Sequence, residues 1–172
     1  QRLTALMHKA IAIIQFKIEG QLFDKHPEWK MSDRKLFEHV DYEKGTVEID
    51  GKEYEMTSCH FPTIDPQHPN QLSKEEEALM QKLHHSFMVC EKLHKHIRVM
   101  LQHGCMYAIF NNNLLFHASC PLNEDGSLKE VEIYPGHRYS GKDLMHHTGM
   151  QIRTAFQQDS DPAEKQYAID YF

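Results

Sequence analysis

Apolar residues recur at helical spacing in three stretches of the chain. In residues 2–18, 73–103 and 141–158 most apolar positions lie three or four residues apart. This spacing predicts three helices, each with one apolar face. We expect Gly20 to end the first of them, because glycine is common just beyond a helix C-terminus.

The stretch 73–103 has the clearest helix limits. Ser73 and Glu76 form the S-x-x-E pattern of a capping box, and Gly104 follows the last apolar position. The apolar stripe consists of Leu79, Leu83, Phe87, Cys90, Leu93, Ile97 and Met100 or Leu101. It predicts a buried face along one continuous helix, longer than most helices of globular proteins.

Alternating apolar and polar residues predict two β-hairpins. Residues 45–56 contain the turn pair Asp50-Gly51, and residues 106–117 contain Asn111-Asn112. Both pairs tolerate the left-handed backbone that a tight hairpin turn requires. The remaining predicted elements are a short helix over 35–40 capped by Ser32, a strand over 131–133 and a final helix opened by Asp161-Pro162.

Composition narrows the class of protein. The chain has 172 residues and a net charge of -6, and it lacks the basic tracts that bind nucleic acid. Its apolar runs are too short to span a bilayer, and no signal peptide is visible. The cysteines at 59, 90, 105 and 120 form no C-x-x-C pair, which predicts free thiols in a reducing compartment. We expect a cytoplasmic protein without nucleic-acid or membrane partners.

The sequence begins and ends within amphipathic patterns typical of helices. Residue 1 is Gln, helical spacing begins at once, and residues 167–172 stop without a Gly or Pro terminator. We therefore expect residues 1–172 to be a single internal fragment of a longer protein.

Histidine is abundant, with 14 copies, and one copy has a distinctive setting. His117 ends an apolar strand and precedes Ala118, Ser119 and a sharp exit at Pro121. A histidine at a strand end can serve as a metal ligand or an acid/base group, or it can be an ordinary surface side chain. The other histidines, including the pairs at 84–85 and 146–147, fit either a metal-binding module or a solvated helix face.

Several sequence blocks together resemble the class III, Firmicutes-type fructose-1,6-bisphosphatases, which are calcineurin-like metallophosphatases. Residues 106–121 resemble the motif in which a hairpin strand of those enzymes delivers a metal-binding histidine. The longer matches are LTALMHKA at 3–10, FKIEGQ at 16–21, DYEKGT at 41–46, FPTID at 61–65, PLNEDG at 121–126, YSGK at 139–142 and DSDPAEK at 159–165.

The resemblance implies an α+β fold, part of a metallophosphatase-type αββα sandwich with β-hairpins and long helices. Residues 20–103 would be a family-specific insertion, and residues 104–172 would be part of the metallophosphatase core. His117 would be one ligand of a two-metal Mn²⁺ site, although the family usually has Gly where this chain has Ala118. The family's other ligand motifs are absent from this chain, so the fragment alone is expected to be inactive.

The implied activity is metal-dependent hydrolysis of fructose 1,6-bisphosphate to fructose 6-phosphate and phosphate, a step of gluconeogenesis. Arg138, Tyr139 and Lys142 are candidate substrate contacts, because cations and backbone amides near a helix N-terminus favour phosphate. They also fit an ordinary helix start with solvated charges. The implied partners are a sugar bisphosphate and further copies of the protein, in a homo-oligomer. The alternatives are a histidine-rich metal-binding module and a structural or oligomerisation module without catalysis.

Overall fold

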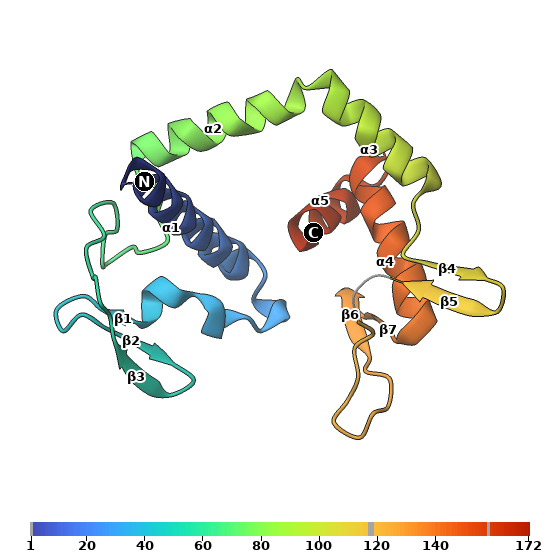
Figure 1. Cartoon of the computed structure of the whole chain (residues 1–172), viewed down its shortest axis with the longest axis horizontal. Coiled ribbons are helices and arrows are strands. Elements are labelled where there is room, and N and C mark those ends of the chain that lie inside the picture. The colour runs from blue at the N-terminus through green and yellow to red at the C-terminus, as the bar shows by residue number, and fades with distance from the viewer. Residues whose placement is uncertain (1, 117–118, 158) are drawn as a thin grey trace. The chain divides into compact units, whose positions relative to one another are not determined.

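The computed structural model describes residues 2–116, 119–157 and 159–172, which form two units, Gln1–Val89 and Cys90–Phe172 (Figure 1). The helices are α1 (Arg2–Lys25), α2 (Lys74–Met88), α3 (Glu91–His103), α4 (Gly141–Phe156) and α5 (Pro162–Tyr171). The strands are β1 (Val40–Asp41), β2 (Thr46–Ile49), β3 (Lys52–Glu55), β4 (Tyr107–Phe110), β5 (Asn113–Phe116), β6 (Val131–Tyr134) and β7 (His137–Tyr139). Short 3₁₀ helices are η1 (Pro27–Trp29), η2 (Ser32–Arg34) and η3 (Leu36–His39). No helix in these described ranges has both the length and the apolar character needed to cross a membrane.

The first predicted hairpin is confirmed as the β2–β3 pair of an antiparallel sheet in the order β1-β2-β3. Val47 lies opposite Tyr54 in the ladder. Asp50 and Gly51 both have positive φ, 52° and 72°, as a tight turn with right-handed strand twist requires. The local sequence therefore determined both the strands and their register.

The prediction that Gly20 ends the first helix is wrong, because α1 continues to Lys25. Gly20 is a buried residue within α1, and Asn70 lies directly against it. A Cβ atom at this position would lie 2.4 Å from Asn70 Cγ, much closer than two carbon atoms can approach. This glycine therefore permits a loop to contact the helix backbone, which is another common use of glycine.

The core of the first unit combines aromatic packing with one buried ion pair. The Phe37 ring contacts Phe16 and Phe61, each at 5.8 Å between centroids. Lys17 is fully buried, and its Nζ donates to Glu76 Oε2 at 2.8 Å. Glu76 also accepts from the backbone N–H of Ser73, so the predicted capping box is confirmed and tied to α1 through Lys17.

The short helix predicted over 35–40 is present as the 3₁₀ helix η3, whereas the predicted cap at Ser32 is wrong. Ser32 is the first residue of η2, and the residue before η2, Met31, makes no side-chain cap bond. The segment buries Phe37, whose contacts with distant aromatic rings outweigh a weak local preference for α-helix.

The prediction of one continuous helix over 73–103 is also wrong. α2 ends at Met88, Val89 closes it, and Cys90 has extended dihedral angles before α3 begins. Valine and cysteine are weaker helix formers than leucine or lysine, whereas the apolar spacing continues through the break and does not reveal it. Gly104 follows the end of α3, as predicted.

The predicted burial of the apolar stripe on these helices is wrong for much of its length. Its exposed members are Leu79, Leu83, Phe87, Cys90 and Met100. Phe87 and Met100 are 61% and 70% exposed. The stripe is therefore an uncovered apolar surface, not part of a core.

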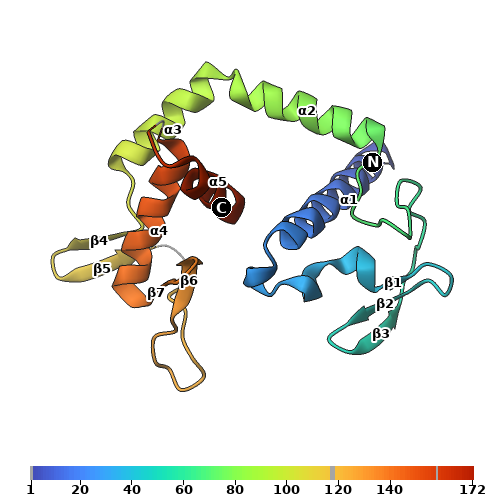
Figure 2. The same ribbon diagram turned by 180° about the vertical axis from the view of Figure 1, so that it is seen from behind.

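In the second unit, the β4–β5 hairpin is confirmed, with Asn111 and Asn112 at φ values of 49° and 61°. The strand predicted over 131–133 is extended to Tyr134 and pairs with β7, which the sequence pattern did not predict. α4 and α5 lie side by side in both views (Figures 1 and 2). The N-terminus of α5 is capped by Asp161, whose carboxylate accepts from two backbone amides, as its position before Pro162 predicts. All four cysteines are free, as expected.

Candidate functional site

The three predicted substrate contacts lie on β7 and the first turn of α4, in the second unit (Figure 1). Arg138 and Tyr139 are the last two residues of β7, and Lys142 follows Gly141, the first residue of α4. Successive side chains of a strand point to opposite faces of the sheet. The three residues are close in sequence, but the structure does not direct the side chains of Arg138 and Tyr139 to one point.

Arg138 faces carboxylates. It lies opposite Glu132 in the β6–β7 ladder, with Nη1 3.6 Å from Glu132 Oε2. Its Nε lies 3.7 Å from Glu130 Oε2. The three side chains are exposed and the distances exceed those of a hydrogen bond, so these pairs are weak. A phosphate at this guanidinium would nevertheless face two negative charges.

Tyr139 faces a different group of side chains. Its ring stacks on the imidazole of His147 from α4, with 3.7 Å between centroids and 12° between planes. Its hydroxyl lies 3.5 Å from His137 Nδ1. Both histidines line a cavity of about 230 Å³ with Tyr139, Gln151 and Glu164. Of the three predicted substrate contacts, Tyr139 is the one that lines this cavity.

Lys142 does not line this cavity. Its Nζ is 5.9 Å from the centre of the Tyr107 ring on β4, a cation–π distance. Ser140, the residue before α4, makes no side-chain cap bond. The first amides of α4 therefore lack the hydroxyl cap that would otherwise compete with an anion.

Apart from Tyr139, the residues that line this cavity were not predicted as functional, and Gln151 and His147 are notable among them. Gln151 Nε2 is buried and has no hydrogen-bond partner among the described residues. Such an atom is uncommon in a folded protein, because burying an unpaired donor costs about 1–3 kcal/mol. His147 was grouped with the other histidines in the sequence. Its half-buried stacking contact depends on tertiary structure, so no local pattern could have identified it.

The predicted metal ligand, His117, lies outside the described residues. Within residues 2–116, 119–157 and 159–172, no three His, Cys, Asp or Glu side chains are grouped to hold a metal ion. His84, His85, His96 and His103 are exposed, as expected for a solvated helix face.

Known proteins related to this chain agree with the blocks noted in the sequence. A family model described as Firmicute fructose-1,6-bisphosphatase matches residues 1–172. A protein of Bacteroides fragilis named fructose-1,6-bisphosphatase class 3 is 49% identical over 170 residues, covering 99% of this chain and 26% of the relative. Proteins of the same name from Bacteroides thetaiotaomicron and Clostridium novyi are 48% and 47% identical, covering 99% and 98% of this chain.

These relatives are much longer than the chain. The chain spans about a quarter of the length of the curated relatives it matches. No solved structure matches it. Because the family model covers the sequence from the first residue to the last, the chain belongs to the Firmicute fructose-1,6-bisphosphatase family.

Proposed function

We propose that the full-length protein hydrolyses fructose 1,6-bisphosphate to fructose 6-phosphate and phosphate, as a cytoplasmic enzyme of gluconeogenesis. The observation that carries the proposal is family membership over the whole chain, together with relatives named for this activity at 47–49% identity. The reaction adds water across the ester bond of the phosphate on the first carbon. The P–O bond to the sugar breaks, and the sugar oxygen takes a proton.

We further propose a two-metal Mn²⁺ site with His117 as one ligand, on the basis of the sequence resemblance. When bound, a metal pair supplies an activated water and neutralises charge on the phosphoryl oxygens. Imidazole with carboxylate and amide oxygens suits manganese. The remaining ligands would come from sequence motifs that this chain lacks, so residues 1–172 alone would not hydrolyse the substrate.

For the substrate we propose contacts from Arg138, Tyr139 and Lys142, and the geometry supports them unequally. Lys142 stands next to uncapped amides at the α4 N-terminus, which favours a phosphate there. Tyr139 lies in a cavity and offers a hydroxyl donor to a sugar or phosphate oxygen. Arg138 would have to leave Glu130 and Glu132 to bind phosphate.

We propose that residues 104–172 are part of a metallophosphatase-type αββα sandwich, and the β4–β5 hairpin supports this. Alternation places Ile109 and Leu114 on one face and Phe110 and Leu115 on the other, all more than half exposed. A hairpin that is apolar on both faces is typical of strands covered on both sides. Further polypeptide of the longer protein would cover it.

We propose that residues 20–103 are a family-specific insertion that contributes to homo-oligomer contacts. The exposed apolar stripe on α2, with Leu79, Leu83 and Phe87, supports this role. Sedimentation of the full-length protein tests it: we expect an oligomer that Phe87→Glu dissociates. A monomer at all concentrations would contradict the oligomer proposal without affecting the proposed activity.

The activity is tested by phosphate release from fructose 1,6-bisphosphate, measured for the full-length protein and for residues 1–172 with added Mn²⁺. We expect turnover only by the full-length protein, abolished by a chelator and restored by Mn²⁺. His117→Ala should lower the rate by at least about 100-fold, because loss of a metal ligand exceeds the usual effect of an outer-shell change. The matched control is His103→Ala, an exposed histidine on α3. Equal rates for the two variants would contradict the ligand assignment, and no turnover by the unmodified protein would contradict the activity.

A further inference from the structure

A stacked pair of rings joins His147 of α4 to Tyr139 of β7, one of the proposed substrate contacts. The two rings lie 3.7 Å apart between centroids, with 12° between their planes. Within the residues that the structure describes, the Tyr139 hydroxyl has one hydrogen-bond partner, His137 Nδ1 at 3.5 Å. A hydrogen bond of that length is weak, so the stacking is the stronger of the two contacts that orient the Tyr139 side chain.

The pair forms because the chain turns sharply between β7 and α4. Gly141, the first residue of α4, is buried and has a φ of 53°. A Cβ atom there would lie 2.8 Å from Leu128 Cδ1, so both the backbone conformation and the close contact favour glycine. This turn places the second turn of α4, which carries His147, beside the end of β7.

His147 belongs to a face of α4 that forms one wall of the cavity lined by Tyr139 (the Tyr139 cavity), of about 230 Å³. The members of this wall follow the i, i+3, i+4, i+7 spacing of a single helix face: His147, Met150, Gln151 and Thr154. On β7, Tyr139 and His137 point to the same side because they are two residues apart, whereas Arg138 points to the other. The stacking therefore holds Tyr139 at the edge between the strand wall and the helix wall.

The lining indicates which part of a sugar phosphate the Tyr139 cavity suits. Four of its residues carry rings: Tyr134, His137, Tyr139 and His147. Glu164 of α5 also lines it, and no Lys or Arg side chain of the described residues does, so a phosphate would face a carboxylate there. Aromatic rings offer apolar area to the carbon atoms of a sugar, and Gln151, Thr154 and Glu164 carry groups that bond hydroxyls. The cavity thus suits the sugar, whereas the uncapped amides beside Lys142 suit a phosphate.

We propose that His147 is a positioning residue, which holds the Tyr139 ring so that the ring and its hydroxyl contact the sugar portion of the substrate. The proposal rests on the proposed function, in which Tyr139 contacts the substrate. His147 acts through Tyr139 and takes no part in breaking the P–O bond. Its loss should therefore weaken substrate binding more than it slows the chemical step.

The test is steady-state hydrolysis of fructose 1,6-bisphosphate by variants of the full-length protein. His147→Ala should raise KM about fivefold and leave kcat within about twofold, because the lost contact helps to bind the substrate and does not touch the reacting atoms. Tyr139→Phe, which removes the hydroxyl alone, should raise KM by a similar factor. His147→Phe keeps a flat ring for stacking and should restore KM to near its original value. The control His146→Ala removes an exposed neighbour that does not line the cavity, and it should change neither constant.

A double-mutant cycle separates positioning from a purely structural role. In a Tyr139→Ala background, His147→Ala should not raise KM further, since the ring that it positions is gone. Full additivity of the two changes, or an unchanged KM for His147→Ala, would overturn the proposal. Thermal unfolding checks that each variant folds. If His147→Ala does not fold, His147→Gln, which removes the ring and keeps a polar side chain, takes its place with the same expected rise in KM.

A readout without turnover distinguishes this proposal from the proposed activity. A fluorotyrosine placed at position 139 of the full-length protein reports on the surroundings of that ring by fluorine NMR. We expect its resonance to shift when fructose 6-phosphate binds, and His147→Ala to weaken that binding about fivefold. Inorganic phosphate alone should not shift it, and an equal shift with phosphate would overturn the assignment of the sugar. A shift that depends on His147 in a protein without turnover would contradict the activity alone. Turnover with a resonance that responds neither to the sugar phosphate nor to His147→Ala would contradict the positioning alone.

Discussion

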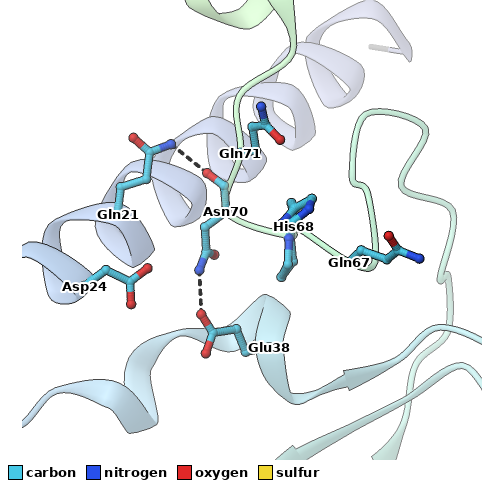
Figure 3. Close-up of a pocket in the computed structure, with 8 residues that line it drawn as sticks. Gln21, Asp24, Glu38, Gln67, His68, Asn70 and Gln71 are labelled. Atoms are coloured by element: carbon cyan, nitrogen blue, oxygen red, sulfur yellow. Dashed lines mark hydrogen bonds between the residues drawn. The ribbon is translucent and has the colours of Figure 1, made fainter.

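Gly20→Ala should destabilise the first unit, although the same change stabilises most helices. Alanine in a helix interior is favoured over glycine by about 1 kcal/mol. Here the new methyl group would lie 2.4 Å from Asn70 Cγ, so the Asn70 side chain and its loop must move. That movement breaks the bond that Asn70 Nδ2 donates to Glu38 and the bond that Gln21 donates to the backbone oxygen of Asn70 (Figure 3).

The size of the effect follows from these two bonds. A bond to a partly exposed carboxylate contributes about 1.5 kcal/mol and a neutral amide bond about 1 kcal/mol. After the gain in helix propensity, we expect the free energy of unfolding to fall by about 1.5 kcal/mol. Urea denaturation followed by the fluorescence of Trp29, the single tryptophan, reports on this unit.

A matched glycine and a double-mutant cycle separate the clash from general effects. Gly149 is also buried within a helix, but a Cβ there would lie 3.3 Å from Arg153 Nη1 and 3.4 Å from Met106 Cγ, contacts that a shift of a few tenths of an ångström relieves. Gly149→Ala, followed by circular dichroism, should therefore be neutral or stabilising. In an Asn70→Ala background, Gly20→Ala should become stabilising, because its obstacle is gone. A higher unfolding free energy for the single Gly20→Ala variant would contradict the predicted clash with Asn70.

Other predictions concern charge, aromatic stacking and turn geometry in the same unit. Burial alone would raise the pKa of Glu76, but Lys17 and the amide of Ser73 outweigh it and hold that pKa below 4.5. This stabilisation is present above pH 4.5 and is lost as the pH falls through the lowered pKa, so acid urea denaturation should show a decline that Glu76→Gln flattens. Lys17→Met should lower the unfolding free energy by about 3–5 kcal/mol, because it leaves a buried carboxylate unpaired; a loss below about 1 kcal/mol would contradict this. His26 stacks on Trp29 with 4.2 Å between ring centroids, so His26→Ala should change the tryptophan fluorescence of the folded protein at constant pH, and an unchanged spectrum would contradict the stacking. Gly51→Ala should cost about 1 kcal/mol in thermal or urea unfolding, since its φ is 72° with open space around it; an unchanged midpoint would argue against the turn geometry.

Elements whose cause lies within a few residues were predicted from the sequence. The turns at Asp50-Gly51 and Asn111-Asn112 require residues with a left-handed backbone conformation. Gly, Asn and Asp adopt that conformation more readily than other residues, so these residue types predict the turns. The Ser73 capping box and the Asp161-Pro162 helix start are equally local, since each cap bonds amides two or three residues away. For such features the sequence contains the full physical cause.

Features whose cause lies far along the chain were not predicted. Gly20 resembles a helix stop until Asn70, fifty positions later, is placed against it. The break between α2 and α3 leaves the apolar spacing unchanged, so periodicity alone cannot detect it. The contact between Tyr139 and His147 and the unpaired amide of Gln151 arise from the packing of a strand against a helix. The residues that line the Tyr139 cavity belong to this second class.

The exposed apolar residues connect these observations with the length of the relatives. A two-stranded hairpin is marginally stable in water by itself, yet β4–β5 exposes large apolar side chains such as Ile109 and Phe110 on both faces. The stripe on α2 is uncovered as well, and Phe87 is its most exposed member. Surfaces of this kind are retained where another element covers them, and relatives about four times as long contain ample polypeptide to do so. The faces that the apolar spacing predicted to be buried are thus exposed among the described residues, and they are the surfaces that the longer protein would cover under the roles proposed above.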